Sequence, residues 1–206
     1  MSQKYKFLYF PMKAVGEPIR LLFHYANVEF EDIRVSNEEW AKMKSEMPWN
    51  LLPVLVVDGK HQLSQCLTIF RYLAREFGLV GADEFETAKC NEYIDAMDEV
   101  RLDVLQMFRE SDPAKKAAIK KNVVENTFPK AWPKFNGILK RNGTGFLVGE
   151  GVTCADIYVA YMVDLLTGFV EFSTMSDYPE LDDHRKKILN LPGIKEWIAT
   201  RPYTAF

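Results

Sequence analysis

Strand signals in this chain of 206 residues are confined to its first 80 residues. There, short runs of β-branched and aromatic residues alternate with segments of helical periodicity, in the order β-α-β-α-β-β-α. Strand signals largely vanish from Gly81 onward, where helical periodicity takes over. The change predicts an α/β domain over residues 1–80 and an all-α domain over residues 82–206, with the boundary in the stretch Gly78–Asp83.

Local patterns define the elements of the first part. An aromatic run that ends before Pro11 predicts a short buried strand, and Asp58-Gly59 between apolar residues predicts a hairpin. Ser36 and Glu39 form a capping box, which predicts the start of a helix. The expected strands are 5–10, 30–35, 53–57 and a short one around 62–63; the expected helices begin near Glu17, Ser36 and Ser64.

The second part is expected to contain helices alone. A long helix over 83–110 is followed by one that begins near Pro113 and that Pro129 and Pro133 should kink or end. Thr153 and Asp156 form a second capping signature. Pro179 and Pro192 each lie near the start of a further short helix, and the glycine-rich run 143–151 predicts a loop between helices.

Composition narrows the functional classes. The chain is 48% hydrophobic and 27% charged, as globular proteins are, and its net charge of −3 argues against nucleic-acid binding. No apolar run approaches the roughly 18 residues that a membrane span needs. Three widely spaced cysteines and three scattered histidines argue against a disulfide framework and a zinc site. We expect a reduced cytoplasmic protein that binds no metal, nucleic acid or membrane.

The order of elements, with Leu-Pro-Val at residues 52–54, predicts a thioredoxin-like fold for the first domain. Redox members of that fold carry a CxxC motif after the first strand. Here that turn reads Tyr9-Phe10-Pro11-Met12 and contains no cysteine. Disulfide exchange is therefore excluded at this position, and any sulfur chemistry must come from another molecule.

Four segments together resemble the cytosolic glutathione S-transferases, with the best match in the sigma class and its nematode-type relatives. They are YKFLYFPMKAVGEPIRLLF (5–23), LPVLVVDG (52–59), QCLTIFRYLA (65–74) and FLVGEGVTCADI (146–157). The resemblance implies the cytosolic glutathione transferase fold, a thioredoxin-like domain followed by a helical domain. It also implies a homodimer that uses glutathione as co-substrate against small hydrophobic electrophiles.

The resemblance gives Tyr9, at the end of the first strand, the catalytic role. Alternation alone places Tyr5, Phe7 and Tyr9 on one face of the strand, which fits a core tyrosine equally well. In the family, the hydroxyl of this tyrosine donates a hydrogen bond to the glutathione sulfur and favours the thiolate. Such help is needed because a free thiol, with a pKa of about 8.5, is mostly protonated at neutral pH.

The resemblance also implies a set of glutathione-binding residues. Trp40 and Lys44 are four residues apart on one helix face, and would hold the glycine end of glutathione. Without the resemblance, they read as an exposed lysine beside a half-buried tryptophan. Leu52, before a cis Pro53, would present its backbone to the cysteinyl part of the peptide.

The γ-glutamyl end would lie at the start of the third helix. Gln65 and Cys66 occupy that helix N-terminus, whose free N–H groups suit a carboxylate. The family usually has Gln-Ser here, so Cys66 is a departure. Asp98 would reach the glutathione amine from the partner subunit; its alternative is a solvated charge on a helix.

The electrophile pocket would be lined by Phe10, Lys13, Val15 and Gln106. The vertebrate sigma-class enzyme that makes prostaglandin D has an arginine at the position of Val15 and a tryptophan at that of Gln106. Both differences weaken that specific assignment. The expected function is glutathione transfer for detoxification. The alternatives are a glutathione-dependent isomerase or peroxidase of the prostaglandin-synthase type, and a non-catalytic crystallin-like or ligand-carrying protein.

Overall fold

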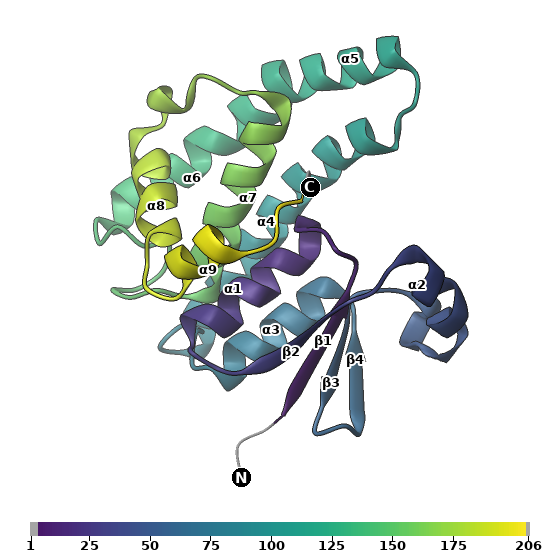
Figure 1. Cartoon of the computed structure of the whole chain (residues 1–206). Coiled ribbons are helices and arrows are strands. Elements are labelled where there is room, and N and C mark those ends of the chain that lie inside the picture. Colours follow the sequence, from purple (N-terminus) through teal and green to yellow (C-terminus); the bar gives the residue numbers. More distant parts are fainter. Residues whose placement is uncertain (1–3, 205–206) are drawn as a thin grey trace. The chain divides into compact units, whose positions relative to one another are not determined.

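A computed structural model describes residues 4–204 of the chain, which fall into two compact units (Figure 1). The first unit contains the residues up to Gly78 together with those from Leu191 onward, and the second is Leu79–Asn190. The C-terminal segment, which the sequence analysis places in the all-α domain, thus packs with the α/β part, because helix α9 (Ile194–Thr200) contacts helix α1 (Glu17–Tyr25).

The first unit is built on a four-stranded mixed sheet of order β2-β1-β3-β4. Strand β1 runs parallel to β2, with Tyr5 opposite Phe30, and antiparallel to β3, which pairs antiparallel with β4. The strands are β1 (Tyr5–Tyr9), β2 (Phe30–Arg34), β3 (Val54–Val57) and β4 (His61–Ser64). This is the thioredoxin-like topology that the sequence predicts.

Alternation along β1 directs its side chains to two different layers. The ring of Tyr5 lies edge-on to Phe23 of α1, with 5.3 Å between centroids. Leu8 points the other way, into a cluster with Val35 and Val54 against which Trp40 packs. The helices of this unit are α1, α2 (Asn37–Met43), α3 (Cys66–Glu76) and α9; α1 and α3 lie beside each other along the sheet, with α2 apart from them (Figure 1).

The second unit is helical, as expected. Its helices are α4 (Glu84–Arg109), α5 (Pro113–Asn122), α6 (Phe128–Asn142), α7 (Cys154–Val170) and α8 (Pro179–Leu189). Helix α7 is the central one, buried over most of its length and packed on α4 and α8. Thr153 and Asp156 form the expected capping box. The buried Asp156 carboxylate also pairs with His184 of α8 at 2.8 Å, which ties the two helices together.

Two local expectations were wrong. Pro133 does not end a helix but lies inside α6, while the irregularity is a π-helical segment, Val123–Thr127, just before that helix. Pro133 is the sixth residue of α6, so it removes one internal hydrogen bond, the one to the Pro129 carbonyl, without ending the helix. The residue that caps α3 is Gln65, since Ser64 is buried and donates to the Pro53 carbonyl.

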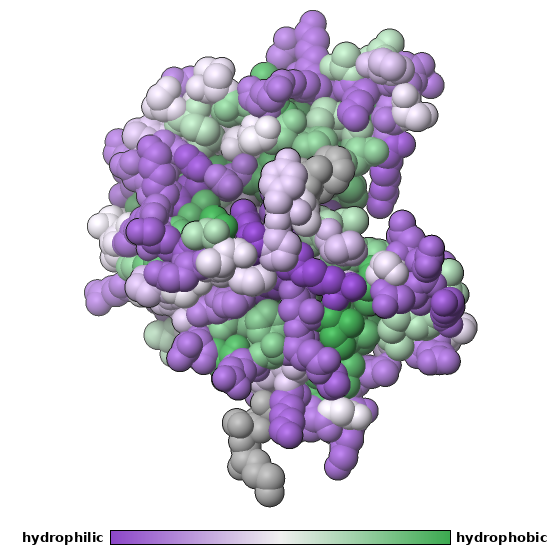
Figure 2. Space-filling model, viewed as in Figure 1, coloured by the Kyte–Doolittle hydropathy of each residue, from purple (hydrophilic) through white to green (hydrophobic). Residues whose placement is uncertain are grey.

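The predicted glycine-rich loop is present, and the large apolar side chains lie mostly in the interior. Gly143 ends α6 in the left-handed conformation, and the glycine-rich run after it is the predicted loop. On the face seen in Figure 2, hydrophilic residues predominate, with smaller apolar areas between them. The large apolar side chains are mostly buried within the units.

Candidate active site

Tyr9 is the last residue of β1 and its side chain is buried, with only 6% exposed. Its backbone carbonyl accepts a hydrogen bond of 2.8 Å from Val35, which fixes the strand end. The ring stacks on Phe7 at 6.2 Å between centroids and lies edge-on to Phe10 at 5.9 Å. The backbone of Gly16 lies directly against the same ring. Tyr9 is therefore held in one orientation from several sides.

Tyr5, on the same face of β1, has a different environment. Burial, followed by the neighbouring Tyr72, Glu76 and Asp58, raises the pKa of its hydroxyl to about 12. The Tyr5 phenol stays protonated throughout the physiological range. Of the two tyrosines on this face, Tyr9 is the one at the open carboxyl end of the strand, where thioredoxin-like folds carry their chemistry.

An aromatic contact links Tyr9 to the next predicted residues. Phe10 lies edge-on to Trp40 of α2 with 6.0 Å between centroids, and Trp40 and Leu52 pack on the same apolar cluster. The Ser36 capping box starts α2 and so sets the direction of Trp40. Lys44, four residues later, is exposed and lies just past the end of α2, as its C-cap and the first residue of a 3-10 turn, Lys44–Glu46.

The predicted peptide-binding edge follows from β3 and β4. The Leu52–Pro53 bond is cis, as the family resemblance implies. The Ser64 hydroxyl donates to the Pro53 carbonyl at 3.4 Å, so Gln65, the next residue, lies near that bond. Gln65 has φ of 74°, a conformation that costs a non-glycine residue of order 1–3 kcal/mol, and such residues cluster at functional sites. Cys66 then opens α3, whose cap makes no side-chain hydrogen bond.

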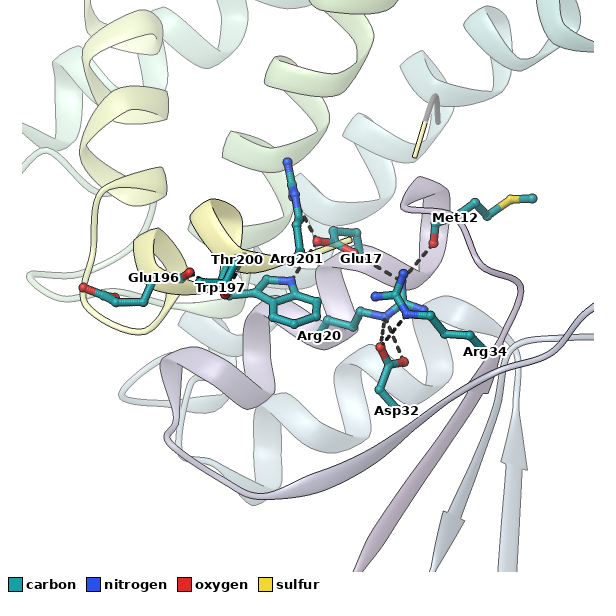
Figure 3. Close-up of polar contacts among 9 residues, drawn as sticks. All are labelled: Met12, Glu17, Arg20, Asp32, Arg34, Glu196, Trp197, Thr200 and Arg201. Carbon is teal, nitrogen blue, oxygen red and sulfur yellow. Dashed lines mark hydrogen bonds and ion pairs between the residues drawn. The ribbon is translucent and has the colours of Figure 1, made fainter. Parts of the chain in front are cut away.

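A charged cluster around Arg20, which the sequence pattern did not indicate, joins Glu17, Asp32, Arg34 and Arg201 (Figure 3). Arg20 of α1 is fully buried, and its guanidinium carbon lies 5.9 Å from the Tyr9 ring centroid. Its Nε donates to both oxygens of Asp32, at 3.0 and 3.1 Å, and its Nη1 donates to the buried Glu17 at 3.2 Å. The available signal was a Glu and an Arg three residues apart on α1, a spacing at which opposite charges pair on a helix.

Two predicted site residues, Asp98 and Gln106, belong to the second unit. Asp98 of α4 accepts hydrogen bonds from Arg101, at 2.5 Å, and from the Tyr158 hydroxyl, at 2.7 Å. Its carboxylate is thus engaged within the chain, which the sequence alone did not suggest. Gln106 lies on the same helix, two turns further on, and is exposed.

The three cysteines differ in access. Cys66 is half-buried, whereas Cys90 and Cys154 are buried side by side in the second unit. The hydrogen bond with Cys90, together with burial, raises the pKa of the Cys154 thiol, while the same bond lowers the pKa of Cys90. Among residues 4–204, no group of three or more histidines, cysteines and acids is arranged to hold a metal ion. Over the same residues, no helix is long and apolar enough to cross a bilayer.

Comparison with known proteins decides what this arrangement belongs to. Models of the glutathione S-transferase N-terminal and C-terminal domains match residues 3–75 and 98–201. A glutathione S-transferase of Anopheles gambiae is 35% identical over 200 residues, which cover 97% of this chain and 98% of that protein. The chain belongs to the glutathione S-transferase family. It is therefore an enzyme of a family that uses glutathione as co-substrate.

Solved structures of glutathione S-transferases have the same fold. The Nu-class enzyme of Haemonchus contortus is 37% identical, with a TM-score of 0.91 and complete coverage of both chains. A Necator americanus enzyme described as monomeric is 34% identical, with a TM-score of 0.90 over 98% of this chain and 100% of that one. The comparisons therefore do not confirm the predicted sigma class, because a Nu-class structure matches as well.

Proposed function

We propose that the Tyr9 hydroxyl donates a hydrogen bond to the sulfur of bound glutathione and stabilises its thiolate. The observation that carries this proposal is the placement of a buried, tightly packed Tyr9 at the end of β1, linked through Phe10 to Trp40. Lowering the thiol pKa by about two units needs about 2.7 kcal/mol of preference for the anion. One directed donor in a site with little water can supply much of that preference.

The rest of the first unit offers matching groups for the peptide. Lys44 provides a cation for the glycine carboxylate beside Trp40, and the Leu52 backbone before the cis bond would face the cysteinyl part. The N-terminus of α3, at Gln65 and Cys66, presents backbone N–H groups and a positive dipole end, which favour the γ-glutamyl carboxylate. The Cys66 thiol is a weaker donor than the usual serine, but its backbone N–H remains.

The thiolate would attack a small hydrophobic electrophile, by substitution or conjugate addition, in the role of detoxification. In the first unit, we assign the contacts with the electrophile to Phe10, Lys13 and Val15; the role of Gln106 stays a prediction from the family resemblance. A cytoplasmic location and the sigma or Nu class are further parts of this proposal. No step in it requires a metal.

Glutathione binding and turnover together test the proposed function. The protein should be retained on immobilised glutathione, bind it by calorimetry and conjugate it to a chloronitrobenzene substrate. For Lys44→Ala, the matched control is Lys130→Ala, which removes an exposed lysine side chain of α6 outside the proposed site. A protein that neither binds glutathione nor conjugates it would contradict the proposal and favour a non-catalytic descendant of the family.

Assembly is a separate part of the proposal. We infer a homodimer in which Asp98 approaches the glutathione amine of the partner subunit, and its bonds to Arg101 and Tyr158 would orient it. Sedimentation should then give twice the mass of one chain at micromolar concentration. Because a relative from Necator americanus is described as monomeric, a fully active monomer is the outcome that would remove Asp98 from the site.

A further inference from the structure

The C-terminal segment is connected to the Tyr9 region through buried charges. Glu17 is 1% exposed, and its two oxygens have different partners. Oε2 accepts from Arg20, while Oε1 accepts from the indole of Trp197 and from Arg201, each at 2.9 Å. Trp197 belongs to α9 and Arg201 follows it, 180 and more residues after Glu17, and Figure 3 shows their side chains converging on Glu17.

Arg20 connects that carboxylate to the segment that carries Tyr9. Its Nη1 donates to the Met12 carbonyl at 2.9 Å, and Met12 in turn donates to the Phe10 carbonyl at 2.7 Å. Nη2 has no hydrogen-bond partner among residues 4–204, and the guanidinium carbon lies 5.4 Å from the centroid of Phe7 and 5.9 Å from that of Tyr9. Ring faces attract a cation at these distances, so Arg20 contacts both the backbone and the ring of the Tyr9 segment.

The charged groups of the cluster share partners, so the loss of one group affects the others. Arg20, Arg34 and Arg201 supply three guanidinium groups, and Glu17 and Asp32 supply two carboxylates. A fully buried charge that loses a partner cannot be rehydrated, so it shifts toward the partners that remain. If Arg201 no longer neutralises Glu17, the Glu17 carboxylate draws more on Arg20, at the expense of Met12 and of the ring faces.

Aromatic stacking fixes the other side of α9. The Trp197 ring stacks on His24 of α1, with 4.3 Å between centroids and an interplanar angle of 16°. The Arg34 guanidinium lies 5.9 Å from the Trp197 centroid. Trp197 thus holds its N–H toward Glu17 in a defined direction, and α9 is docked by contacts that do not depend on Arg201.

We propose that Glu17, Arg20, Trp197 and Arg201 form a positioning network that holds the Tyr9 ring and the Phe10–Met12 backbone for catalysis. The C-terminal segment is then part of the catalytic apparatus, although it touches no reacting atom. The Arg20 guanidinium also places a positive charge beside the Tyr9 ring. This inference rests on the proposed role of Tyr9.

Two mild substitutions test the network. Arg201→Met keeps the apolar stem and removes the charge, and Trp197→Phe removes the indole donor while retaining a ring for His24. We expect each to lower kcat by about 3- to 10-fold, a fraction of the roughly 100-fold cost of a 1 Å misplacement. The KM for glutathione should stay within about twofold, because Lys44 and Gln65 are untouched. The pKa of the bound thiol, followed by thiolate absorbance, should rise.

Controls separate positioning from general stability. Arg185→Met removes an arginine that pairs with Asp164 and Asp182 in the second unit, and it should leave kcat and the thiol pKa unchanged. Arg201→Lys, which restores a cation, should recover most of the lost kcat. Thermal unfolding of each variant shows whether it is folded; if Arg201→Met is not, Trp197→Phe decides.

The outcomes are distinguishable from failure of the proposed function. Parental kcat and thiol pKa in both variants, with activity lost in Tyr9→Phe, would overturn the network and leave the role of Tyr9 intact. A raised KM with unchanged kcat would also overturn it, because that result indicates binding rather than positioning. Full activity in Tyr9→Phe itself would instead refute the proposed function.

Discussion

Gly16→Ala is a sharp test of how closely the Tyr9 ring is constrained. Gly16 has φ of −81° and ψ of −25°, so alanine fits the backbone without strain. A Cβ atom there would overlap Cδ1 of the Tyr9 ring and lie 2.8 Å from Cε1 and 2.9 Å from Cγ. Ordinary carbon contacts are about 3.5–4.0 Å, so the ring must move by about 1 Å.

The expected size of the effect follows from two opposing contributions. Replacing glycine by alanine at a compatible position stabilises a protein by about 0.4–1 kcal/mol, whereas overpacking a core costs about 1–3 kcal/mol. We expect a net loss of about 1–2 kcal/mol, or a Tm lower by about 2–8 °C. A reacting group displaced by 1 Å can cost about 100-fold in rate, so kcat/KM should fall by about 10- to 100-fold.

Turnover of a chloronitrobenzene substrate and thermal unfolding measure both effects. Gly168→Ala is the matched control, because Gly168 lies within α7 and a Cβ there meets nothing within 4 Å. The control should keep full activity and gain slightly in Tm. If Gly16→Ala keeps kcat/KM within about twofold and loses no stability, the ring is not held as described and the reasoning is wrong.

The other predictions concern the glutathione contacts, a titration and a thiol. Lys44→Ala and Gln65→Ala should raise the KM for glutathione more than they lower kcat. If calorimetry gave both variants the glutathione affinity of the parent, the proposed position of the binding cleft would be wrong. Burial lowers the pKa of His24 below its usual 6.5, so as pH falls the unfolded chain binds a proton at this imidazole before the folded protein does. The free energy of unfolding in urea should therefore decrease as pH falls through about 6.5, and it should decrease less in His24→Gln. Cys66, half-buried at a helix N-terminus, should react with iodoacetamide before the two buried cysteines, and glutathione should slow that labelling; faster labelling of a buried cysteine would contradict this.

Sequence was sufficient where the determining interaction is local. The Ser36–Glu39 box and the Thr153–Asp156 box each lie within four residues, and both start the helices that they predict. Alternation in β1 likewise placed Tyr9 on one face with Phe7. Proline was misleading at Pro133, which removes one internal hydrogen bond of α6 but does not end the helix.

Sequence was insufficient where the partners are far apart in the chain. Glu17 and Arg201 are separated by 184 residues, and no local pattern indicates that they pair. The contact of Asp98 with Tyr158 spans 60 residues and was missed for the same reason. Family resemblance supplied the roles of Tyr9 and Gln65, since spacing alone left Tyr9 equally compatible with a core position.

Turnover of Tyr9→Phe at about pH 6.5 tests the central claim most directly. The change removes one donor and little volume, so the fold should survive, as thermal unfolding would show. Loss of about 1.4–4 kcal/mol of anion stabilisation predicts that kcat/KM falls by about 10- to 1000-fold. A folded Tyr9→Phe variant with near-parental kcat/KM would contradict the assignment of Tyr9 as the residue that stabilises the thiolate.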